Sequence, residues 1–354
     1  MRTLTCDILV VGAGPAGSSA AREAASKGAS VIVVERRAAV GVPVQCAEYI
    51  PAPLIGELRC GRGFVVQSVK GMRTFLNGRL LQQIDAPGYT IRRDVFDRML
   101  ADEAEKSGAG ILLSTIAVAR EEGEVIVREK GGTFSRVRAK VIIGADGPRS
   151  KVAGWTGCKN RNLMPAVQAR VALDRPMEYT EIFLDDRIYG GYGWLFPKGN
   201  EANVGVGMKV RGSGGEIGRV LFDLLARLSS GGKISGRPLD IVSGWVPVEP
   251  GGAMRAGSIL LAGDAAGHTH PITGAGIPQA VIGGGMAGKW AAHAVDRADW
   301  GKLAGYESEW REFFGETLER ATSRRRLLES NWDRLEEIVK YCWVTFKEYH
   351  SEYE

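Results

Sequence analysis

An apolar, β-rich run at residues 6–11 leads directly into the glycine pattern Gly12-Ala13-Gly14-Pro15-Ala16-Gly17. An alanine-rich helical segment follows at 15–28, and a second β-branched run at 30–34 ends at Glu35. A strand, a helix and a second strand in this order form a βαβ unit. The unit predicts the beginning of a doubly wound parallel sheet, and therefore an α/β fold with a Rossmann-type domain.

Each glycine of this pattern has a physical reason. Gly12 permits the tight turn, Gly14 lets the backbone approach a pyrophosphate, and Gly17 lets the helix pack closely on the strand. The helix N-terminus favours phosphates, and the acid at Glu35 suits ribose hydroxyls. The pattern predicts a dinucleotide site, with FAD and NAD both open. The residues expected around this part of the cofactor are Gly12, Gly14, Ala16, Gly17, Glu35 and Arg36.

Two later strands end in glycine-rich turns that carry an aspartate. Residues 141–150 place Asp146 and Gly147 after a buried strand, and residues 259–267 place Asp264 in the same way. Ligands of open α/β sheets bind at the carboxyl ends of the strands. We therefore expect these turns to meet the opening glycine turn at one cofactor site.

The length of the chain and its changing pattern predict more than one domain. At 354 residues the chain exceeds the size at which one hydrophobic core usually stops growing. Residues 165–246 alternate apolar and polar side chains, as in an antiparallel sheet, with one predicted helix at 215–229. The predicted division is a discontinuous cofactor domain of residues 1–62, 88–160 and 247–300, an antiparallel-sheet substrate domain of residues 63–87 and 161–246, and a helical C-terminal region of residues 301–354.

Composition excludes several classes of protein. The net charge is only +5 and the basic residues are scattered, so the footprint of a nucleic-acid-binding protein is absent. The five cysteines are far apart and form no CxxC pair, which argues against a disulfide framework and a structural zinc site. The sequence shows no apolar leader and no run of about 18 apolar residues, so a cytoplasmic protein is expected.

The aspartate turns resemble those of group A flavin hydroxylases and of geranylgeranyl reductases, which share an FAD fold. Three stretches favour the reductases. Pro43-Val44-Gln45-Cys46-Ala47-Glu48 is similar to their PVxCGE or PVxCAE segment, and Gly191 to Pro197 resembles their YxWxFP motif. Gly263 to Ile277 is similar to their GDAAGxxxPxxGxGI motif. The similarity covers roughly residues 6–300 and implies FAD as the cofactor.

The resemblance also implies roles for individual residues. Asp264 would bind the flavin ribitol, and the helix that begins at Gly274-Ala275-Gly276-Ile277 would face the flavin N1/O2 edge, where its N-terminus favours negative charge. The further FAD contacts that it implies are Cys46, Ala47, Arg93 and Ala117. The prenyl pocket that it implies is lined by Tyr192, Trp194, Phe196 and Pro197, with His270 nearby.

The sequence departs from the family pattern at Tyr189, where the aromatic motif usually has a proline, and at Tyr49, where a glycine is usual. Both changes put the exact substrate in doubt and leave the flavin site alone. Tyr192, Trp194 and Phe196 alternate along a predicted strand and should share one face, which suits either a flat pocket wall or an ordinary sheet core.

The implied activity is reduction of carbon–carbon double bonds in a geranylgeranyl or related prenyl lipid by hydride from reduced flavin. Cys46 or water would supply the proton, although a lone cysteine is more often an inert buried thiol. For Glu48, a loop salt bridge or a solvated carboxylate is favoured over a proton relay. The electron donor is open between NADPH, NADH and ferredoxin or another protein partner.

Two alternative functions remain open. A flavin monooxygenase that hydroxylates a lipophilic or aromatic compound would use the turn from Gly144 to Ser150, which resembles a hydroxylase motif. A flavoprotein that only relays electrons would yield no product other than the reduced acceptor.

Two motifs near the C-terminus have more than one interpretation. His268 and His270 form an HxH pair without a third ligand, so no metal is expected, and a role beside the flavin or the substrate stays open. The basic cluster Arg324-Arg325-Arg326 precedes apolar residues at helical spacing. It suits peripheral contact with the inner face of the cell membrane, a substrate phosphate, or simply a helix with one buried face.

Overall fold

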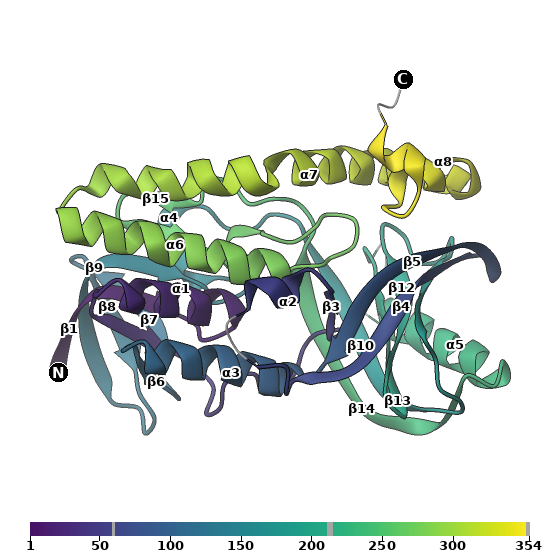
Figure 1. The fold of residues 1–354 in the computed structure, drawn as a ribbon, viewed down its shortest axis with the longest axis horizontal. Helices are drawn as coiled ribbons and strands as arrows, with labels where there is room; N and C mark the ends of the chain where they lie inside the picture. The colour runs from purple at the N-terminus through teal and green to yellow at the C-terminus, as the bar shows by residue number, and fades with distance from the viewer. Residues whose placement is uncertain (59–60, 211–214, 352–354) are drawn as a thin grey trace.

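The computed structural model describes residues 1–58, 61–210 and 215–351. Within these residues the chain forms two eight-stranded sheets, which lie side by side in Figure 1. The first has the strand order β15-β16-β9-β1-β2-β6, with β8 and β7 following β9 on a branch. Its strands are β1 (Arg2–Val11), β2 (Val31–Val34), β6 (Gly110–Leu112), β7 (Ile116–Glu121), β8 (Glu124–Arg128), β9 (Phe134–Gly144), β15 (Arg255–Ala256) and β16 (Ile259–Leu261).

The predicted βαβ unit is confirmed. β1 pairs in parallel with both β2 and β9, and Ile8, Leu9 and Val10 near its C-terminal end are fully buried. A parallel strand in this position is covered on both faces, which explains its unbroken apolar run. The helices of this part are α1 (Pro15–Ser26), α3 (Arg93–Lys106), the short α4 (Lys151–Thr156) and α6 (Ile277–Arg297).

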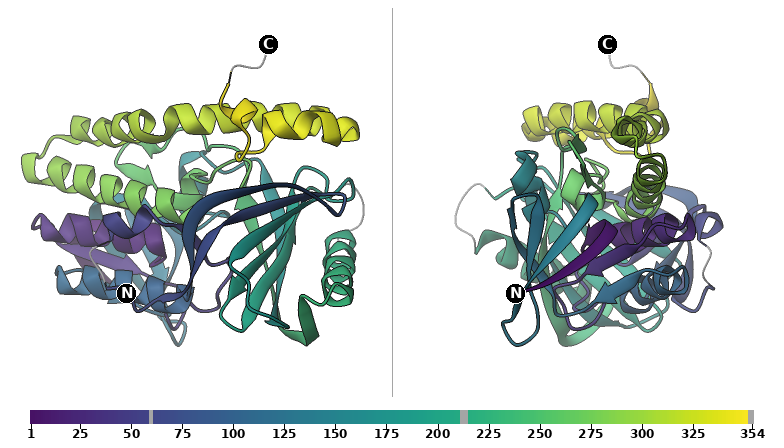
Figure 2. Two further views of the ribbon diagram at one scale, coloured as in Figure 1. Left: turned by 45° about the vertical axis from the view of Figure 1, so that its right-hand side comes forward. Right: turned by 90° about the vertical axis from the view of Figure 1, so that its left-hand side faces the viewer.

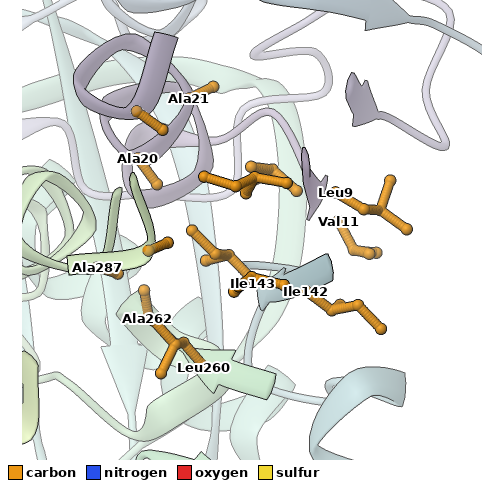
Figure 3. Close-up of a cluster of buried hydrophobic side chains, with 14 of the residues drawn as sticks. Leu9, Val11, Ala20, Ala21, Ile142, Ile143, Leu260, Ala262 and Ala287 are labelled. Carbon is orange, nitrogen blue, oxygen red and sulfur yellow. The ribbon is translucent and has the colours of Figure 1, made fainter. Parts of the chain in front are cut away.

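Glycine allows α1 and α6 to pack in close contact. A Cβ on Gly284 would lie 2.2 Å from the Ala16 carbonyl oxygen, and one on Gly288 would lie 2.1 Å from that of Ala20. Glycines of the run at 283–288 therefore serve helix packing. Figure 3 shows Ala20 and Ala287 from these helices beside branched side chains of the sheet in one buried cluster.

The second sheet has the order β14-β10-β13-β12-β11-β4-β5-β3 and is antiparallel except where β11 pairs with β4. The helix α5 (Glu216–Ser230) lies against one face of it (Figure 2), and leucines of this helix pack on that face. The short α2 (Leu54–Glu57) follows β3. The strands are β3 (Tyr49–Pro51), β4 (Val65–Leu76), β5 (Arg79–Ile91), β10 (Leu163–Leu173), β11 (Tyr179–Leu184), β12 (Tyr192–Lys198), β13 (Glu201–Gly207) and β14 (Ile234–Pro247).

The C-terminal region is helical, as expected. The long α7 (Ala304–Ser330) lies over α6 and reaches the second sheet (Figure 1). There α8 (Leu335–Cys342) packs on residues of the second sheet. The 3-10 turns are η1 (Gly263–Ala266), η2 (Trp300–Leu303), η3 (Trp332–Arg334) and η4 (Lys347–His350). In the described part of the chain, no helix combines the length and apolarity needed to cross a membrane. The division into domains stays a prediction.

The described cysteines carry free thiols: Cys6, Cys46, Cys158 and Cys342. Cys60 lies outside the described residues.

Candidate active site

A cavity of about 580 Å³ is bounded by elements of both sheets. The turn before α1, the segment around Cys46, the turns after β9 and β16 and the start of α6 line one part of it. Strands of the second sheet, β10, β12 and β14 above all, line another part, together with Trp343. The structure thus brings together segments that are far apart in the sequence. The predicted site residues in its wall are Gly14, Ala16, Cys46, Ala47, Arg93, Gly147, Tyr192, Trp194, Phe196, Asp264, His270, Gly274, Gly276 and Ile277.

Gly12 and Gly17 lie behind this wall and shape the turn. Gly12 has a φ of +101°, and a Cβ on it would lie 2.4 Å from the Ala145 carbonyl oxygen. A Cβ on Gly17 would lie 1.8 Å from the Gly12 carbonyl oxygen. Gly14 differs, because it lines the cavity and a Cβ on it would meet no protein atom within 4 Å. The backbone at Gly14 is therefore open to a ligand that approaches closely.

Two predicted carboxylates support the turns rather than line the cavity. Glu35 is buried, and its oxygens accept hydrogen bonds from the backbone amides of Ala13 at 2.8 Å and Arg37 at 2.9 Å. Asp146 accepts hydrogen bonds from the Ser150 hydroxyl at 2.5 Å and the Lys151 amide at 2.6 Å. The expected contact of Glu35 with ribose hydroxyls stays a prediction.

Three further predicted residues also lie outside the cavity wall. Arg36 is exposed beyond β2, Ala117 is buried in β7, and Pro197 is buried in β12.

Asp264 faces the cavity without a partner for its carboxylate among the described residues. Its backbone carbonyl is held by the Asn160 side-chain amide at 2.7 Å. Burial raises the pKa of Asp264 to about 6, although the Arg93 guanidinium acts to lower it. An acceptor without a partner suits a ligand that brings hydroxyl groups. Together with the open backbone at Gly14, it fits the ribitol and pyrophosphate of FAD.

The raised pKa of Asp264 predicts a pH-dependent stability for the flavin-free protein. A carboxyl with a higher pKa in the folded state stabilises the fold fully below its unfolded pKa of 3.8, and this contribution is lost as the pH rises through about 6. Relative to Asp264→Asn, the wild type should lose up to about 3 kcal/mol of unfolding free energy between about pH 4 and pH 7. Urea unfolding at both pH values measures this, and parallel curves for the two proteins would contradict it.

Side chains of the second sheet hold the Cys46 segment in place. The Gln168 amide donates to the Cys46 carbonyl at 3.0 Å, and its oxygen accepts from Trp194 Nε1 at 3.0 Å. The Asn203 amide donates to the Ala47 carbonyl at 3.1 Å. These bonds connect the predicted proton donor to the aromatic strand β12.

Arg93 approaches the same cysteine from the start of α3. Its guanidinium pairs with both oxygens of Asp97, at 2.7 and 2.9 Å, and lies within hydrogen-bonding distance of the Cys46 thiol. Burial opposes the charge on Arg93, but Asp97 and Cys46 outweigh this effect and its pKa is raised. A fixed positive charge beside Cys46 stabilises negative charge on its sulfur.

Glu48 forms a buried salt bridge and is not solvated. Its carboxylate accepts from Lys198 Nζ at 2.5 Å, from the Asn203 amide at 3.0 Å and from the Arg93 backbone amide at 2.9 Å. Glu48 is absent from the cavity wall. Of the interpretations that the sequence allowed, the loop salt bridge is therefore the one observed.

Glu48→Gln is expected to lower the free energy of unfolding by about 3 kcal/mol, because Lys198 would keep its charge in a buried place without a counter-charge. The double variant Glu48→Gln/Lys198→Met should recover part of the loss. The exposed pair of Lys70 and Glu178 provides the control, and Glu178→Gln should leave stability unchanged. Urea unfolding compares the four proteins. Equal effects of the two glutamate substitutions would contradict the prediction.

The aromatic side chains of β12 form part of the cavity wall. Tyr192 packs edge-on against Trp194, with ring centroids 5.9 Å apart, and against Trp343 at 5.2 Å. Trp343 follows α8 and also lines the cavity. This residue was not among those predicted from the sequence, because a tryptophan at the end of an amphipathic helix is equally typical of an ordinary core.

The two departures from the family pattern have different consequences. Tyr49 lines the cavity and packs on Phe196, with ring centroids 5.7 Å apart. Tyr189 is outside the cavity wall and packs on Trp332. Only Tyr49 therefore changes the shape of the pocket.

His268 and His270 lie in different environments. His268 is buried against Trp310, with ring centroids 4.1 Å apart, and burial lowers its pKa to about 3. It does not line the cavity, so the geometry does not support a role beside flavin or substrate for this residue. His270 does line it, and burial lowers its pKa to about 4. No group of three or more potential ligands for a metal ion occurs among the residues described.

His270 is held as a neutral ring. Its Nδ1 accepts hydrogen bonds from the Ile272 and Thr273 amides, each at 3.3 Å. The ring proton therefore lies on Nε2, which is 3.3 Å from the Tyr349 hydroxyl. This contact connects the cavity wall to the C-terminal turn η4.

The basic cluster on α7 is mostly structural. Arg325 is buried and binds Glu329 at 2.8 Å and the carbonyls of Pro271 and Gly190, each at 2.8 Å. Arg324 is also buried and donates to the Ser351 carbonyl. Only Arg326 is exposed, and it pairs with Glu249. The structure therefore favours the interpretation as a helix with one buried face, and contact of this cluster with a membrane or a substrate phosphate stays a prediction.

Comparison with known families agrees with this site. Residues 7–154 match the family model for FAD dependent oxidoreductases, and residues 163–246 match that for the geranylgeranyl reductase catalytic domain. Fold and site thus define an FAD-dependent oxidoreductase. The chain belongs to the geranylgeranyl reductase family, as its relatives show.

The chain is 39% identical to a digeranylgeranylglycerophospholipid reductase of Methanothrix thermoacetophila, over 90% of its own length and 86% of the relative's. It is 36% identical to digeranylgeranylglycerophospholipid reductase 1 of Methanopyrus kandleri, over 95% and 93% of the two chains. The structure of a geranylgeranyl bacteriochlorophyll reductase-like protein of Thermoplasma acidophilum superimposes with a TM-score of 0.86 at 30% identity, over 99% of this chain and 94% of that one.

A probable FAD-dependent monooxygenase of Pseudomonas aeruginosa, PqsL, also superimposes, with a TM-score of 0.70 at 19% identity over 95% of this chain and all of that one. At this identity the likeness concerns the fold alone.

Proposed function

We propose that this protein reduces isolated carbon–carbon double bonds in the geranylgeranyl chains of a glycerophospholipid. The observation that carries the proposal is the joining of two features in one cavity. One part presents Gly14 and Asp264 to a flavin, and the other is an apolar wall built from Trp194, Phe196 and Trp343. The names of the relatives support the lipid class.

When bound, reduced FAD supplies the hydride for such a reduction. Gly14 leaves the backbone open to its pyrophosphate, and Asp264 would accept hydrogen bonds from its ribitol. The amides at the start of α6 favour negative charge at the neighbouring edge of the site.

Cys46 is suited to supply the proton. Its Sγ–H can give a proton to the carbon that does not receive the hydride, so that one hydride and one proton saturate each double bond. The Arg93 guanidinium stabilises the thiolate that remains. Solvent then reprotonates the sulfur before the next cycle.

The aromatic wall positions the prenyl chain and excludes water from the cavity. Trp194 and Phe196 are almost fully buried, and Trp343, which follows α8, belongs to the same hydrophobic cluster and packs on Tyr192. A flexible polyisoprenoid gains from burial of apolar surface in such a site.

Anaerobic incubation of the photoreduced enzyme with a digeranylgeranyl glycerophospholipid tests the proposal. Mass spectrometry should show a gain of two hydrogens for each double bond reduced. Unchanged lipid across several prenyl carriers would contradict the proposal. Oxygen incorporation from labelled dioxygen in an aerobic reaction would instead indicate a monooxygenase.

The electron donor and contact with a membrane belong to the same proposal. NADPH, NADH and reduced ferredoxin can be compared by the rate at which each bleaches the oxidised flavin. A lipid substrate favours peripheral contact with the membrane, and flotation of the protein with anionic vesicles measures it.

A further inference from the structure

A second hollow of about 480 Å³ lies beside α4, outside the cavity described above. Arg149, Lys151 and Lys159 line it together with the side chains of Trp155 and Leu163. In the ranges that the structure describes, none of these cations has a carboxylate partner. Side-chain cations that share a concave site without counter-charges favour an anionic ligand.

This second hollow, called the basic hollow below, shares a wall with the 580 Å³ cavity, called the flavin cavity below. Gly147 lines the cavity, and the next residue, Pro148, lines the hollow. The Arg149 guanidinium lies over the Trp245 ring, 5.4 Å from its centroid, and Trp245 lines the cavity. Asn160 lines the hollow and donates hydrogen bonds to the carbonyls of Pro148 and Asp264. A ligand that passes Trp245 can therefore occupy both sites.

Apolar side chains continue from this wall along the outer edge of the second sheet. Leu239, Ile241 and Trp245 lie on one face of β14, with Ser243 between the last two, and are 54%, 48% and 42% exposed. Alternate residues of a strand share one face, so the three form an apolar stripe that ends at the basic hollow. An apolar stripe beside unpaired cations suits an amphiphile with an anionic head better than a free nucleotide.

We propose that the hollow formed by Arg149, Lys151 and Lys159 binds the phosphoester headgroup of the lipid whose prenyl chain enters the cavity past Trp245. Lysine and arginine both bind phosphate oxygens, and the arginine fork can hold two of them. This inference rests on the proposed function, which identifies the prenyl chain that enters the cavity. It adds a site that selects phosphorylated over neutral prenyl lipids.

The variant Lys151→Gln/Lys159→Gln tests the site without disturbing the stacking of Arg149 on Trp245. Its KM for a digeranylgeranyl glycerophospholipid should rise about tenfold or more, with kcat unchanged. Its KM for the neutral digeranylgeranylglycerol in the same micelles should stay that of the wild type. The matched control is Lys130→Gln/Lys302→Gln, which removes the same charge from exposed positions outside the hollow.

Equal rises in KM for the charged and the neutral lipid would overturn the proposal, because the hollow would then not recognise phosphate. A rise in the KM for NADPH with the phospholipid KM unchanged would assign the hollow to a nucleotide donor and also overturn it.

A binding experiment separates this inference from the proposed function. Calorimetric titration at low salt with dihexanoyl phosphatidic acid should show binding to the wild type and a loss of about tenfold or more in the lysine variant. Dihexanoylglycerol should show no such difference. If no prenyl lipid is reduced while this difference holds, the function fails and the site stands. If reduction occurs and the two proteins bind phosphatidic acid equally, the site fails.

Discussion

Gly14→Ala is expected to fold like the wild type and to bind FAD at least about 100-fold more weakly, a loss of about 2.7 kcal/mol. Gly14 has a φ of −72°, which alanine adopts readily, and its Cβ would meet no protein atom within 4 Å. The methyl group would instead point into the space where the pyrophosphate must approach the backbone. Unfolding free energy should stay within about 1 kcal/mol of the wild type, since a poorer helix cap is offset by a less flexible unfolded chain.

The flavin absorbance of the purified protein and a titration with FAD measure this loss, and urea unfolding of the flavin-free protein measures the fold. Gly17→Ala is the matched control, because its Cβ would lie 1.8 Å from the Gly12 carbonyl and should damage both the fold and FAD binding. A Gly14→Ala protein that keeps its flavin would place the pyrophosphate away from this turn.

Cys46→Ala is expected to lower kcat for prenyl reduction by about 100-fold to 10,000-fold, the range for loss of a general acid. Flavin binding should persist, because the segment is held through the carbonyls of Cys46 and Ala47 and the side chain of Glu48, which the substitution keeps. Cys46→Ser should also be slow, since a hydroxyl is a much weaker acid than a thiol. Anaerobic single-turnover reactions followed by mass spectrometry measure the rates.

Cys158→Ser provides the control for loss of a thiol, because Cys158 lies outside the cavity and its hydrogen bonds are only with Thr156 of its own turn. It should leave the rate unchanged. A Cys46→Ala enzyme that reduces the lipid at the wild-type rate would show that water donates the proton.

Much of the fold was predictable because its signals are local. The run before Gly12, the glycine spacing and the acid at Glu35 lie within one βαβ unit, whose backbone geometry depends on neighbours in the chain. The start of α6 and the two aspartate turns were also predictable, because their signals too lie within a few consecutive residues. Their meeting at one cavity was predictable as well, because the carboxyl ends of parallel strands share one edge of a sheet.

Residues whose role depends on distant partners were harder to predict. From the sequence, the Glu48 carboxylate could have been either solvated or paired in a salt bridge. The structure places Lys198 beside it. Arg324 and Arg325 suggested a basic surface, yet both are buried and bind backbone carbonyls. Spacing along a helix shows which residues share a face but not which element covers that face.

The Rossmann-type unit, the cofactor turns and the aromatic alternation of β12 could be predicted from the residues alone, because each depends on backbone requirements that only certain residues meet. Tertiary structure alone decided that Trp343 lines the cavity, and that His270 lines it while His268 is buried in the core. It also decided that Arg149, Lys151 and Lys159 share one hollow. Burial and charge pairing depend on segments far apart in the chain, and these segments meet only when the chain packs.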